Sequence, residues 1–512
     1  MYDISYWLRA QAWMRPSKVA VVGDEERWTY GELDDRVARL AHALRAGLKL
    51  RQGERVALLS ANGPEFLLVL MAVARCGLVL VPLNWRLTPF EQEYQLKDSG
   101  ARRIFASAEY LAVAKDLSNR LSLPAPVRLN GGAETGPDDL LDLEELMAGE
   151  AEDKGDPEPL PWDLPLLIGY TSGTTGKPKG AVLTHANMFW NAMNDLLTID
   201  LRSSDVSITL LPMFHIGGLG LFTLPTLLAG GRVIIPSRFE PEAALHQIER
   251  ERVTIVFGVP TVHQRLLEAI DRLHPDLAAV RMFYSGGAPC PVDLIRAFQA
   301  RRIPFGQGYG LTETSPTVFM LVEEDFNRKQ GTIGRPAPFN RVRLVDPVSA
   351  APVGPDQVGE IIAKGPNVFA YYWQNEEANR QAVQDGWFHT GDLAWADAEG
   401  FVTVAGRLKE MIISGGENVY PVEVEQVLQS HPQVVEAAVY GVADSQWGEV
   451  PHAAVVAAPE STPTEEELRA YCGTRLARYK VPKRIHLVSE FPRNAAGKVT
   501  KAELAARLST SN

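Results

Sequence analysis

Residues 170–180 read YTSGTTGKPKG and concentrate small polar chemistry in one short segment. Glycines permit tight turns that aim several backbone N–H groups at one point, and hydroxyl and ammonium groups add further donors around it. Such a set of donors suits phosphate oxygens. The segment therefore predicts a phosphate site, formed by Thr171, Ser172, Gly173, Thr174, Thr175, Gly176, Lys177 and Lys179.

Two other interpretations of this segment fit less well. A Walker P-loop requires the pattern G-x-x-x-x-G-K-[ST], but Thr171 stands at the first glycine and Pro178 follows Lys177. A flexible linker is the usual meaning of a Gly/Ser/Thr run. However, the buried-strand pattern LPLLIG precedes the segment and the helix-like THANMFW follows it, and linkers rarely sit between such elements.

Further motifs follow along the rest of the chain. They are LPMFHIGG (211–218), SGGAP (285–289), GQGYGLTETSP (306–316), GWFHTGDLA (386–394), GRLKEMIISGGENVYP (406–421) and PRNAAGKV (492–499). In this order they resemble the adenylate-forming enzymes, which include acyl-CoA synthetases, 4-coumarate-type ligases, firefly-type luciferases and standalone adenylation domains. The resemblance spans nearly the whole chain. It is closest to bacterial fatty-acyl-CoA synthetases, in which SGGENVYP and LARYKVPK have near-identical counterparts.

The resemblance implies a reaction in two steps. A carboxylate is first joined to AMP from MgATP with release of pyrophosphate, and a thiol then displaces the AMP. Both steps pass through crowded negative charge, so catalysis should come mainly from positioning and electrostatic stabilisation. The segment at 170–180 would hold the phosphates that leave as pyrophosphate.

Residues at the reacting phosphate follow from the same resemblance. Glu313 and Thr171 match the Mg²⁺ ligands, since a hard cation prefers carboxylate and hydroxyl oxygen. Thr312 would bond the α-phosphate, although an ordinary helix start is the alternative for this stretch. Lys498 resembles the lysine that bridges the carboxylate and the α-phosphate during adenylation, where an ammonium group offsets the charge of the forming bond.

The nucleoside half of ATP has its own matching positions. Tyr309 offers an aromatic face for a purine, and the small residues of SGGAP let the ring approach the backbone. Asp392 can accept bonds from the ribose hydroxyls, and Lys409 matches the hinge about which the small C-terminal domain pivots. The nucleotide-binding positions outside the opening segment are Gly286, Gly287, Ala288, Gln307, Gly308, Tyr309, Thr312, Asp392, Arg407, Lys409 and Lys498.

The acyl pocket is not fixed by the family pattern. His215 matches a position between nucleotide and acyl group, although a packed core histidine is the alternative. Its expected neighbours are apolar or small and offer no charge for an amino group, which favours an apolar acyl tail over an amino acid. These neighbours are Trp190, Met213, Gly217, Gly218, Leu219 and Ser315.

A second substrate, coenzyme A, is also implied. Gly415 and Gly416 would line the passage for its pantetheine arm in a second domain arrangement. Arg86, Arg478 and Lys480 would meet its phosphates, although ordinary exposed basic residues are the alternative for these three.

The elements that must position these motifs alternate between strand and helix, which is typical of an α/β fold with parallel sheets. From residue 341 the pattern changes to short strands between turns, as in a small barrel or meander. Residues 131–162 are rich in Asp, Glu, Gly and Pro and predict a solvated connection with a short helix. Buried strands are predicted at 54–60, 78–84, 101–107, 205–212, 232–237, 253–260 and 281–289, and helices from about 64 and at 241–251.

The expected architecture has two domains. A large N-terminal AMP-binding domain over 1–405 would comprise stacked α/β subdomains and a small β-barrel-like subdomain. A small, mobile C-terminal αβ domain over 406–512 would carry the hinge and the catalytic lysine. Within it, helices are predicted near 422–431 and 464–477, and strands at 434–442 and 452–459.

Composition narrows the classes of protein. The 512 residues carry a net charge of -12, which argues against a nucleic-acid surface. The three cysteines are far apart and form no CxxC pair, which favours a reducing, cytoplasmic location. No signal peptide is expected, and the apolar stretch at 66–84 contains Arg75 and is too short for a membrane span. Peripheral membrane contact and a homodimer are left open.

Four functions compete. The main prediction is an acyl-CoA synthetase for a medium- or long-chain fatty acid. The alternatives are an aryl-CoA ligase of the coumarate or benzoate kind and a standalone adenylating enzyme that loads a carrier protein. A non-catalytic nucleotide-binding relative is disfavoured, because both Glu313 and Lys498 are present.

Overall fold

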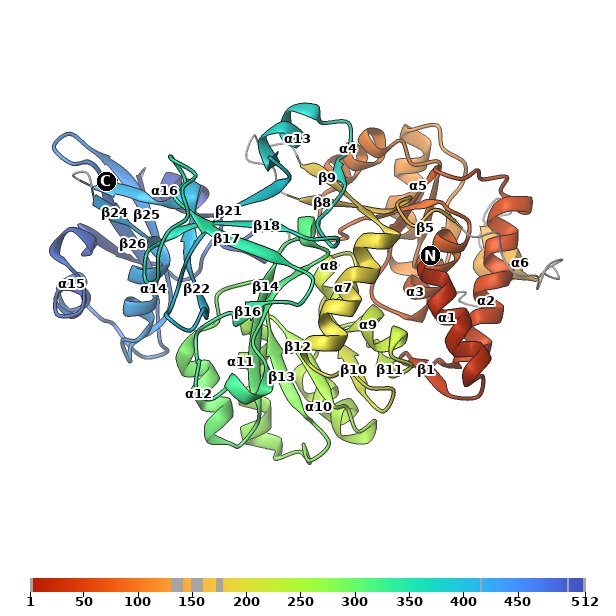
Figure 1. The fold of residues 1–512 in the computed structure, drawn as a ribbon, viewed down its shortest axis with the longest axis horizontal. Helices are drawn as coiled ribbons and strands as arrows, with labels where there is room; N and C mark the ends of the chain where they lie inside the picture. The colour runs from red at the N-terminus through yellow and green to blue at the C-terminus, as the bar shows by residue number, and fades with distance from the viewer. Residues whose placement is uncertain are drawn as a thin grey trace. The chain divides into compact units, whose positions relative to one another are not determined.

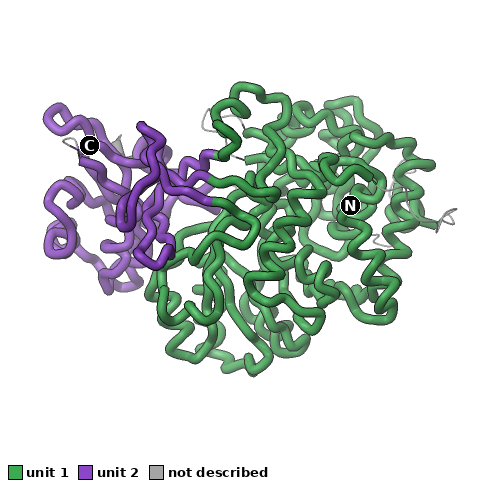
Figure 2. Tube along the Cα trace, viewed as in Figure 1, with its two compact units in different colours: residues 1–341, 363–388 green, residues 342–362, 389–512 purple. Residues whose placement is uncertain are grey.

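The computed structural model describes residues 3–129, 141–148, 160–171, 178–414, 417–494 and 497–509. Two compact units divide these residues (Figure 2). Unit 1 comprises residues 1–341 and 363–388, and unit 2 comprises residues 342–362 and 389–512. These units follow contacts in space, so the division at 405/406, which concerns the part that moves, stays a prediction.

The first sheet of unit 1 has eight strands in the order β19-β9-β8-β4-β3-β5-β6-β7. Its centre is parallel, as the strand–helix–strand pattern predicts, and β9 folds back antiparallel on β8. The strands are β3 (Arg55–Leu59), β4 (Val79–Pro82), β5 (Arg103–Ala106), β6 (Val127–Arg128), β7 (Leu141–Asp142), β8 (Pro165–Thr171), β9 (Lys179–Thr184) and β19 (Tyr371–Tyr372).

The second sheet of unit 1 has nine strands in the order β16-β15-β14-β13-β12-β10-β11-β1-β2. Strands β1 and β10 to β14 run parallel to one another, whereas β2 pairs antiparallel with β1 and β15 pairs antiparallel with β14. The strands are β1 (Val19–Val22), β2 (Arg27–Thr29), β10 (Val206–Thr209), β11 (Arg232–Ile234), β12 (Ile255–Gly258), β13 (Met282–Ser285), β14 (Phe305–Gly310), β15 (Thr317–Met320) and β16 (Arg335–Pro336).

Helices of unit 1 cover and join these sheets (Figure 1). One apolar core takes side chains from both sheets and from α1, α2, α3 and α7. Most of these helices begin at a defined cap or proline. The helices are α1 (Ile4–Met14), α2 (Tyr30–His42), α3 (Pro64–Arg75), α4 (Pro89–Ser99), α5 (Leu111–Arg120), α6 (Leu143–Met147), α7 (His185–Thr198), α8 (Ile216–Gly220), α9 (Thr223–Leu228), α10 (Pro241–Arg250), α11 (Pro260–Leu273), α12 (Val292–Ala300) and α13 (Glu376–Ala382).

Helices α3 and α7 illustrate how the sequence sets these elements. Pro64 occupies the first turn of α3, where its missing N–H costs nothing, and the side chains from Phe66 to Ala74 are at most 1% exposed. Each large apolar side chain buried there contributes about 1.5–3 kcal/mol. Helix α7 begins at Thr184, whose hydroxyl accepts the backbone N–H of Asn187 while the Asn187 side chain accepts that of Thr184.

Unit 2 contains two groups of strands. In the first, β17 (Arg341–Val345), β18 (Gly359–Lys364) and β21 (Trp387–Ala396) are neighbours in that order, and β22 (Val402–Arg407) pairs with β21. The second sheet has the order β24-β23-β26-β25, with β27 parallel to β26. Its members are β23 (Ile412–Ser414), β24 (Glu417–Val419), β25 (Val434–Asp444), β26 (Gly448–Ala457) and β27 (Arg484–Leu487), with helices α14 (Pro421–Gln429), α15 (Glu465–Gly473) and α16 (Lys501–Ser509).

The predicted α/β class and the predicted strands and helices are confirmed within two to four residues at their ends. The strand predicted at 281–289 ends at Ser285, because the glycines of SGGAP begin a loop. The short helix predicted in the 131–162 connection is α6, and the rest of that connection lies largely outside the described residues. In the part of the chain described, no helix has the length and apolarity to cross a membrane.

Gly310 provides a test of local packing at the end of β14. A Cβ atom there would lie 1.5 Å from the backbone oxygen of Pro316, a distance that only backbone movement could relieve. We expect Gly310→Ala to lower the free energy of unfolding by about 2–4 kcal/mol. Differential scanning calorimetry measures this as a lower melting temperature.

Gly47→Ala is the matched control in the same unit. A Cβ atom there meets only Leu146 Cδ1 at 3.8 Å, an ordinary contact distance. Equal melting temperatures for the two variants would contradict the close approach at Gly310.

Candidate active site

Two loops that were predicted to hold adenine lie side by side in the second sheet of unit 1. Strands β13 and β14 are parallel, with Ser285 opposite Gln307. Just beyond this pair, a Cβ atom on Gly286 would lie 3.7 Å from the backbone oxygen of Gly308. Because the carboxyl ends of parallel strands are the usual ligand edge of an α/β sheet, SGGAP and GQGYG are well placed for a shared ligand.

Tyr309 and the SGGAP glycines occupy this edge. The Tyr309 ring is partly exposed and meets Phe319 edge-on at 5.9 Å between centroids, which fixes the ring against β15. Gly287 has φ +81°, a left-handed conformation that favours glycine, and Ala288 follows it as an exposed residue. The predicted adenine-binding residues are thus brought together, while their contacts with adenine stay a prediction.

Glu313 is held in a buried position by two distant segments. Its side chain is 7% exposed, on the short 3-10 turn Thr312–Thr314. The Tyr372 hydroxyl donates to Glu313 Oε1 at 2.8 Å, and the Thr171 hydroxyl donates to the same oxygen at 3.3 Å. The backbone N–H of Phe369 donates to the Glu313 carbonyl at 2.8 Å. The predicted Glu313–Thr171 pair is therefore adjacent in space.

Lys179 stands at the base of the predicted phosphate segment. Thr171 and Lys179 are paired across the β8–β9 hairpin, so both ends of the segment are anchored next to Glu313. The Lys179 ammonium lies 5.4 Å from the centroid of the Tyr372 ring. Burial and the neighbouring Glu313 carboxylate raise the Tyr372 pKa, so its hydroxyl remains a donor. Six predicted phosphate-binding residues lie outside the described residues: Ser172, Gly173, Thr174, Thr175, Gly176 and Lys177.

Thr312 backs onto β8. A Cβ atom on Gly169 would lie 3.0 Å from Thr312 Cγ2, which is closer than most real contacts. The glycine at 169 therefore leaves room for the Thr312–Thr314 turn. The turn that bears Thr312 and Glu313 is consequently packed against the strand that ends at Thr171.

The predicted acyl-pocket residues gather around α8, with one exception. His215 precedes α8, and its ring lies 4.6 Å from the Phe214 ring. A small cavity of about 10 Å³ lies beside the helix, about the space of one water molecule. Met213, Leu219 and Ser315 are fully or almost fully buried, and the backbone oxygen of Ser315 would lie 2.6 Å from a Cβ atom on Gly220. The cavity is lined by Ile208, Thr209, Leu210, Leu211, Gly217, Gly218, Phe222, Thr223 and Phe257.

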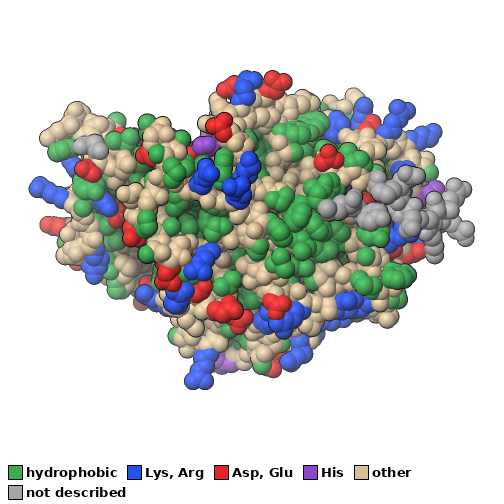
Figure 3. All heavy atoms as spheres, in the orientation of Figure 1, with side chains coloured by type: hydrophobic (Ala, Val, Ile, Leu, Met, Phe, Trp, Pro, Cys, Tyr) green, Lys and Arg blue, Asp and Glu red, His purple; other side chains and the backbone are tan. Residues whose placement is uncertain are grey.

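Trp190 belongs to a different group of side chains. Its ring contacts are with Phe339 at 4.7 Å, Phe189 at 5.4 Å and Trp162 at 6.1 Å. None of these partners was predicted in the acyl pocket. Hydrophobic side chains gather on the face of unit 1 over α7 (Figure 3). The role of Trp190 in acyl binding stays a prediction that these contacts do not favour.

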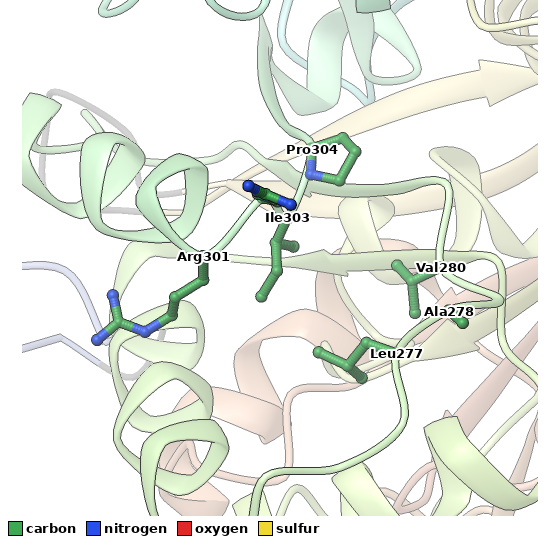
Figure 4. Close-up of a pocket in the computed structure, with 7 residues that line it drawn as sticks. Leu277, Ala278, Val280, Arg301, Ile303 and Pro304 are labelled. Atoms are coloured by element: carbon green, nitrogen blue, oxygen red, sulfur yellow. The ribbon is translucent and has the colours of Figure 1, made fainter.

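A second cavity, of about 240 Å³, lies away from these residues (Figure 4). Its lining comes from residues 277–280 and 301–304, which precede β13 and β14 and so lie at the amino ends of those strands. The Arg301 guanidinium is turned away from Leu277 in the figure and forms two 2.6 Å bonds with Asp271. This cavity has no sequence-predicted site residue.

Asp392 and Arg407 form an ion pair in unit 2. They lie opposite each other on β21 and β22, with 2.8 Å between Arg407 Nε and Asp392 Oδ1. Asp392 is 4% exposed. Lys409 follows on an exposed 3-10 turn, and Gly406 has φ +146°, which favours glycine beside the predicted hinge. The residues predicted to contact ribose and phosphate are thus paired with each other, and their contacts with a ligand stay a prediction.

Lys498 lies on an exposed hairpin loop of unit 2. Its backbone exchanges hydrogen bonds with Asn494, and Gly497 takes φ +80° in the turn. Lys480 donates to both carboxylate oxygens of Glu423, at 2.7 and 2.8 Å, so its charge is engaged within the unit. Arg478 is exposed. Gly415 and Gly416 lie outside the described residues.

Arg86 is the predicted CoA contact in unit 1. Its guanidinium lies 4.7 Å from the centroid of the Trp85 ring. Trp85 in turn stacks on Tyr110 at 5.9 Å and meets Phe214, the neighbour of His215, edge-on at 6.0 Å. Burial lowers the pKa of Arg86 below its usual value. Arg86 is therefore linked by ring contacts to His215, which was predicted in the acyl pocket.

The Glu313 carboxylate and the Thr171 hydroxyl are oxygen ligands of the kind that a magnesium nucleotide needs. Among the described residues, no cluster of three or more His, Cys, Asp or Glu side chains is placed to hold a metal ion. Mg²⁺ requires no such cluster, because one or two carboxylates and the substrate phosphates hold it. One buried carboxylate beside a threonine hydroxyl, at the foot of a phosphate segment, fits this pattern.

Sequence reasoning missed Tyr372 and the polar face of α7. Tyr372 lies in AYYW, outside any of the motifs, and reaches Glu313 only because β19 pairs with β9. On α7, Asn191 and Asp195 read as polar helix residues but are 0% exposed. These two polar residues are four apart, which places them on one face of a helix of mixed polarity. This spacing is the one feature of the sequence that could have indicated a polar face.

Comparisons with known proteins agree with this arrangement. Residues 8–373 match the AMP-binding enzyme family, and residues 423–498 match the AMP-binding enzyme C-terminal domain. A feruloyl-CoA synthase from Amycolatopsis sp is 43% identical over 98% of both chains. An indoleacetate–CoA ligase from Aromatoleum aromaticum is 38% identical over 98% of this chain and 97% of its own. The structure of Bacillus subtilis O-succinylbenzoate coenzyme A synthetase with ATP and magnesium is 34% identical, covers 98% of this chain and 99% of its own, and superposes with a TM-score of 0.86.

Tyr372 provides a test of the Glu313 site. Tyr372→Phe removes the hydroxyl that donates to the buried Glu313 carboxylate, and a hydrogen bond to a charged group is worth enough to slow pyrophosphate formation about tenfold. We also expect a higher Mg²⁺ concentration for half-maximal rate, measured by magnesium titration of pyrophosphate release.

Tyr371→Phe serves as the control, because this neighbouring side chain is 38% exposed. If both variants kept the parental rate and magnesium dependence, Tyr372 would have no part in holding Glu313 for the reaction.

Proposed function

The chain belongs to the family of AMP-binding enzymes and is an AMP-forming acid–thiol ligase, and we propose that it joins an aromatic carboxylic acid to coenzyme A. One observation carries the aromatic substrate: the relative that is 43% identical over nearly the full length of both chains is a feruloyl-CoA synthase. Relatives named for indoleacetate and 2-succinylbenzoate point the same way. The fatty-acid prediction drawn from SGGENVYP and LARYKVPK is not supported by these relatives, and the aryl-CoA alternative fits better.

The residues around α8 support an uncharged, flat acyl group. None of the side chains that line the small cavity there is charged. Phe222 and Phe257 lie 5.5 Å apart at 62°, an edge-to-face arrangement that an aromatic substrate ring can extend. Gly217 adds no side chain to this cavity, and a Cβ atom there would lie 3.8 Å from Leu211 Cδ1 and 3.9 Å from Phe257 Cε1. A ring that binds here must displace part of this lining.

In the first step, a carboxylate oxygen attacks the α-phosphorus of ATP. The new O–P bond forms as the bond to the β-phosphate breaks, and pyrophosphate leaves. Lys179, at the base of the phosphate segment, offsets negative charge on the leaving group, and Thr312 donates to an α-phosphate oxygen. Mg²⁺, when bound, would neutralise phosphate charge, with Glu313 and Thr171 as its protein ligands.

In the second step, the thiol sulfur of coenzyme A attacks the acyl carbon and AMP leaves. Lys498 of unit 2 acts in the first step. A rearrangement about Lys409 then withdraws Lys498, and Gly415 and Gly416 take its place beside the pantetheine arm. Asp392 holds the ribose hydroxyls in both steps. These assignments rest on motif identity, with the Asp392–Arg407 pair as structural support.

A carrier protein is the competing thiol acceptor. Its pantetheine arm would enter by the same passage, so Gly415 and Gly416 do not distinguish it from coenzyme A. The names of the relatives, which are CoA synthases and ligases, favour coenzyme A.

A substrate panel tests the proposed acid. We expect AMP release that depends on CoA and peaks with hydroxycinnamic or other aryl acids, compared with straight-chain fatty acids and amino acids under identical MgATP. A one-carbon difference in an apolar pocket changes kcat/KM about 10- to 200-fold, so the ranking should be clear. A peak among fatty acids would overturn the aromatic proposal, and pyrophosphate release that CoA fails to accelerate would favour a carrier protein.

Lys498→Ala tests the division of labour between the two steps. We expect acyl-adenylate formation to fall about 100- to 1,000-fold, because the lysine charge acts only on the first transition state. Thioester formation from supplied acyl-AMP should stay within about threefold of the parent. Single-turnover assays of each half-reaction measure both quantities.

Lys483→Ala, which changes another exposed lysine of unit 2, should leave both half-reactions unaltered. Equal losses in the two half-reactions of the Lys498 variant, with the fold intact, would refute its assignment to the first step alone.

A further inference from the structure

One buried amide side chain on α7, that of Asn191, bonds two segments that are proposed to hold the two substrates of the first step. Asn191 Nδ2 donates to the backbone oxygen of Gly220 at 2.7 Å, at the end of α8. Asn191 Oδ1 accepts the backbone N–H of Thr317 at 2.8 Å, three residues beyond the end of the turn that bears Glu313. Asn191 is 0% exposed. A single side chain therefore bonds the helix of the acyl pocket and the segment of the metal ligand.

These two segments are also in direct contact. A Cβ atom on Gly220 would lie 2.6 Å from the backbone oxygen of Ser315 and 2.7 Å from Pro316 Cδ. The absence of a side chain at 220 thus lets α8 lie against the Glu313 turn. The Asn191 amide spans this contact and bonds the backbone on each side of it.

Asp195, one turn along α7, holds Asn191 and Thr317 in place. Its carboxylate accepts the Thr317 hydroxyl at 2.8 Å and Asn191 Nδ2 at 3.3 Å. The Thr317 carbonyl accepts two further side-chain amides, from Asn340 at 3.1 Å and Asn367 at 2.7 Å. The start of β15 is thus held at its N–H, its hydroxyl and its carbonyl. A buried network with its partners in place rigidifies the segments that it joins.

We propose that Asn191 is a positioning residue for acyl-adenylate formation, which fixes the acid, held beside α8, relative to the nucleotide, held by the Thr312–Glu313 turn. The reacting oxygen and phosphorus must approach within about 3–3.5 Å, and a misplacement of about 1 Å can cost a hundredfold in rate. Asn191 touches neither substrate and acts by fixing the distance between the two segments. This inference rests on the ligase chemistry and on an acyl site beside α8, but not on an aromatic acid.

Asn191→Ala should change rate rather than binding. We expect kcat for acid-dependent pyrophosphate release to fall about 30-fold, while the KM values for ATP and acid stay within about threefold of the parent. The acid used is the one that the parent protein turns over fastest, so an error in the proposed substrate class leaves the test intact.

Asn194→Ala is the matched control on the same helix. Asn194 is also 0% exposed, and its side chain accepts the backbone N–H of Phe339 at 2.9 Å, outside both segments. We expect a similar fall in melting temperature for the two variants but a kcat within about threefold of the parent for Asn194→Ala. Losses of kcat that follow melting temperature in both variants would overturn the proposal and leave Asn191 as a structural residue.

Thr317→Val provides a second route if Asn191→Ala fails to fold. It removes the hydroxyl that Asp195 accepts and keeps the shape of the side chain. We expect kcat to fall about five- to tenfold, and Thr317→Ser to restore it, since serine returns the hydroxyl. A kcat for Thr317→Val equal to that of the parent, or a loss confined to KM, would overturn the proposal.

Discussion

Burial of the Glu313 carboxylate is the constraint on which the rest of the site depends. A charged group removed from water must be hydrogen-bonded or paired, or its burial destabilises the fold. Here the partners come from β8 and β19, which lie far apart in the chain and become neighbours through β9. The turn from the second sheet is therefore held in place by partners that the first sheet of unit 1 supplies.

The polar face of α7 holds the backbone that follows the same turn. Asn187, Asn191, Asn194 and Asp195 are all buried, in a helix whose exposed face includes Leu197 at 56%. The three asparagines bond the backbone of residues 220, 317, 339, 366 and 368, none of which lies in a regular helix interior. Asp195 accepts the Thr317 hydroxyl and the Asn191 amide. Burial raises the pKa of the Asp195 carboxyl well above its usual range. Loop backbone near the site is thus satisfied by a helix rather than by water, which keeps the loops in one conformation.

The residues proposed for the two reaction steps are divided between the two compact units. Those proposed to bind phosphate, metal and acyl group belong to unit 1, while the Asp392–Arg407 pair, Lys409 and Lys498 belong to unit 2. Such a division suits a reaction in which one set of residues acts in the first step and is replaced in the second. Each unit has its own apolar core, so either can keep its internal geometry while the other moves.

The sequence by itself determined the α/β class and the order of the elements, because apolar periodicity and short motifs are local properties of the chain. The same motifs predicted the site residues. It also identified Glu313 and Thr171 as partners through their motifs. Tertiary structure alone decided that Tyr372 completes this pair, that Trp190 packs with Phe339, and that the asparagines of α7 face inward. These contacts join residues whose separation in sequence carries no pattern, and a polar residue on a helix reads as exposed until its buried backbone partners are known.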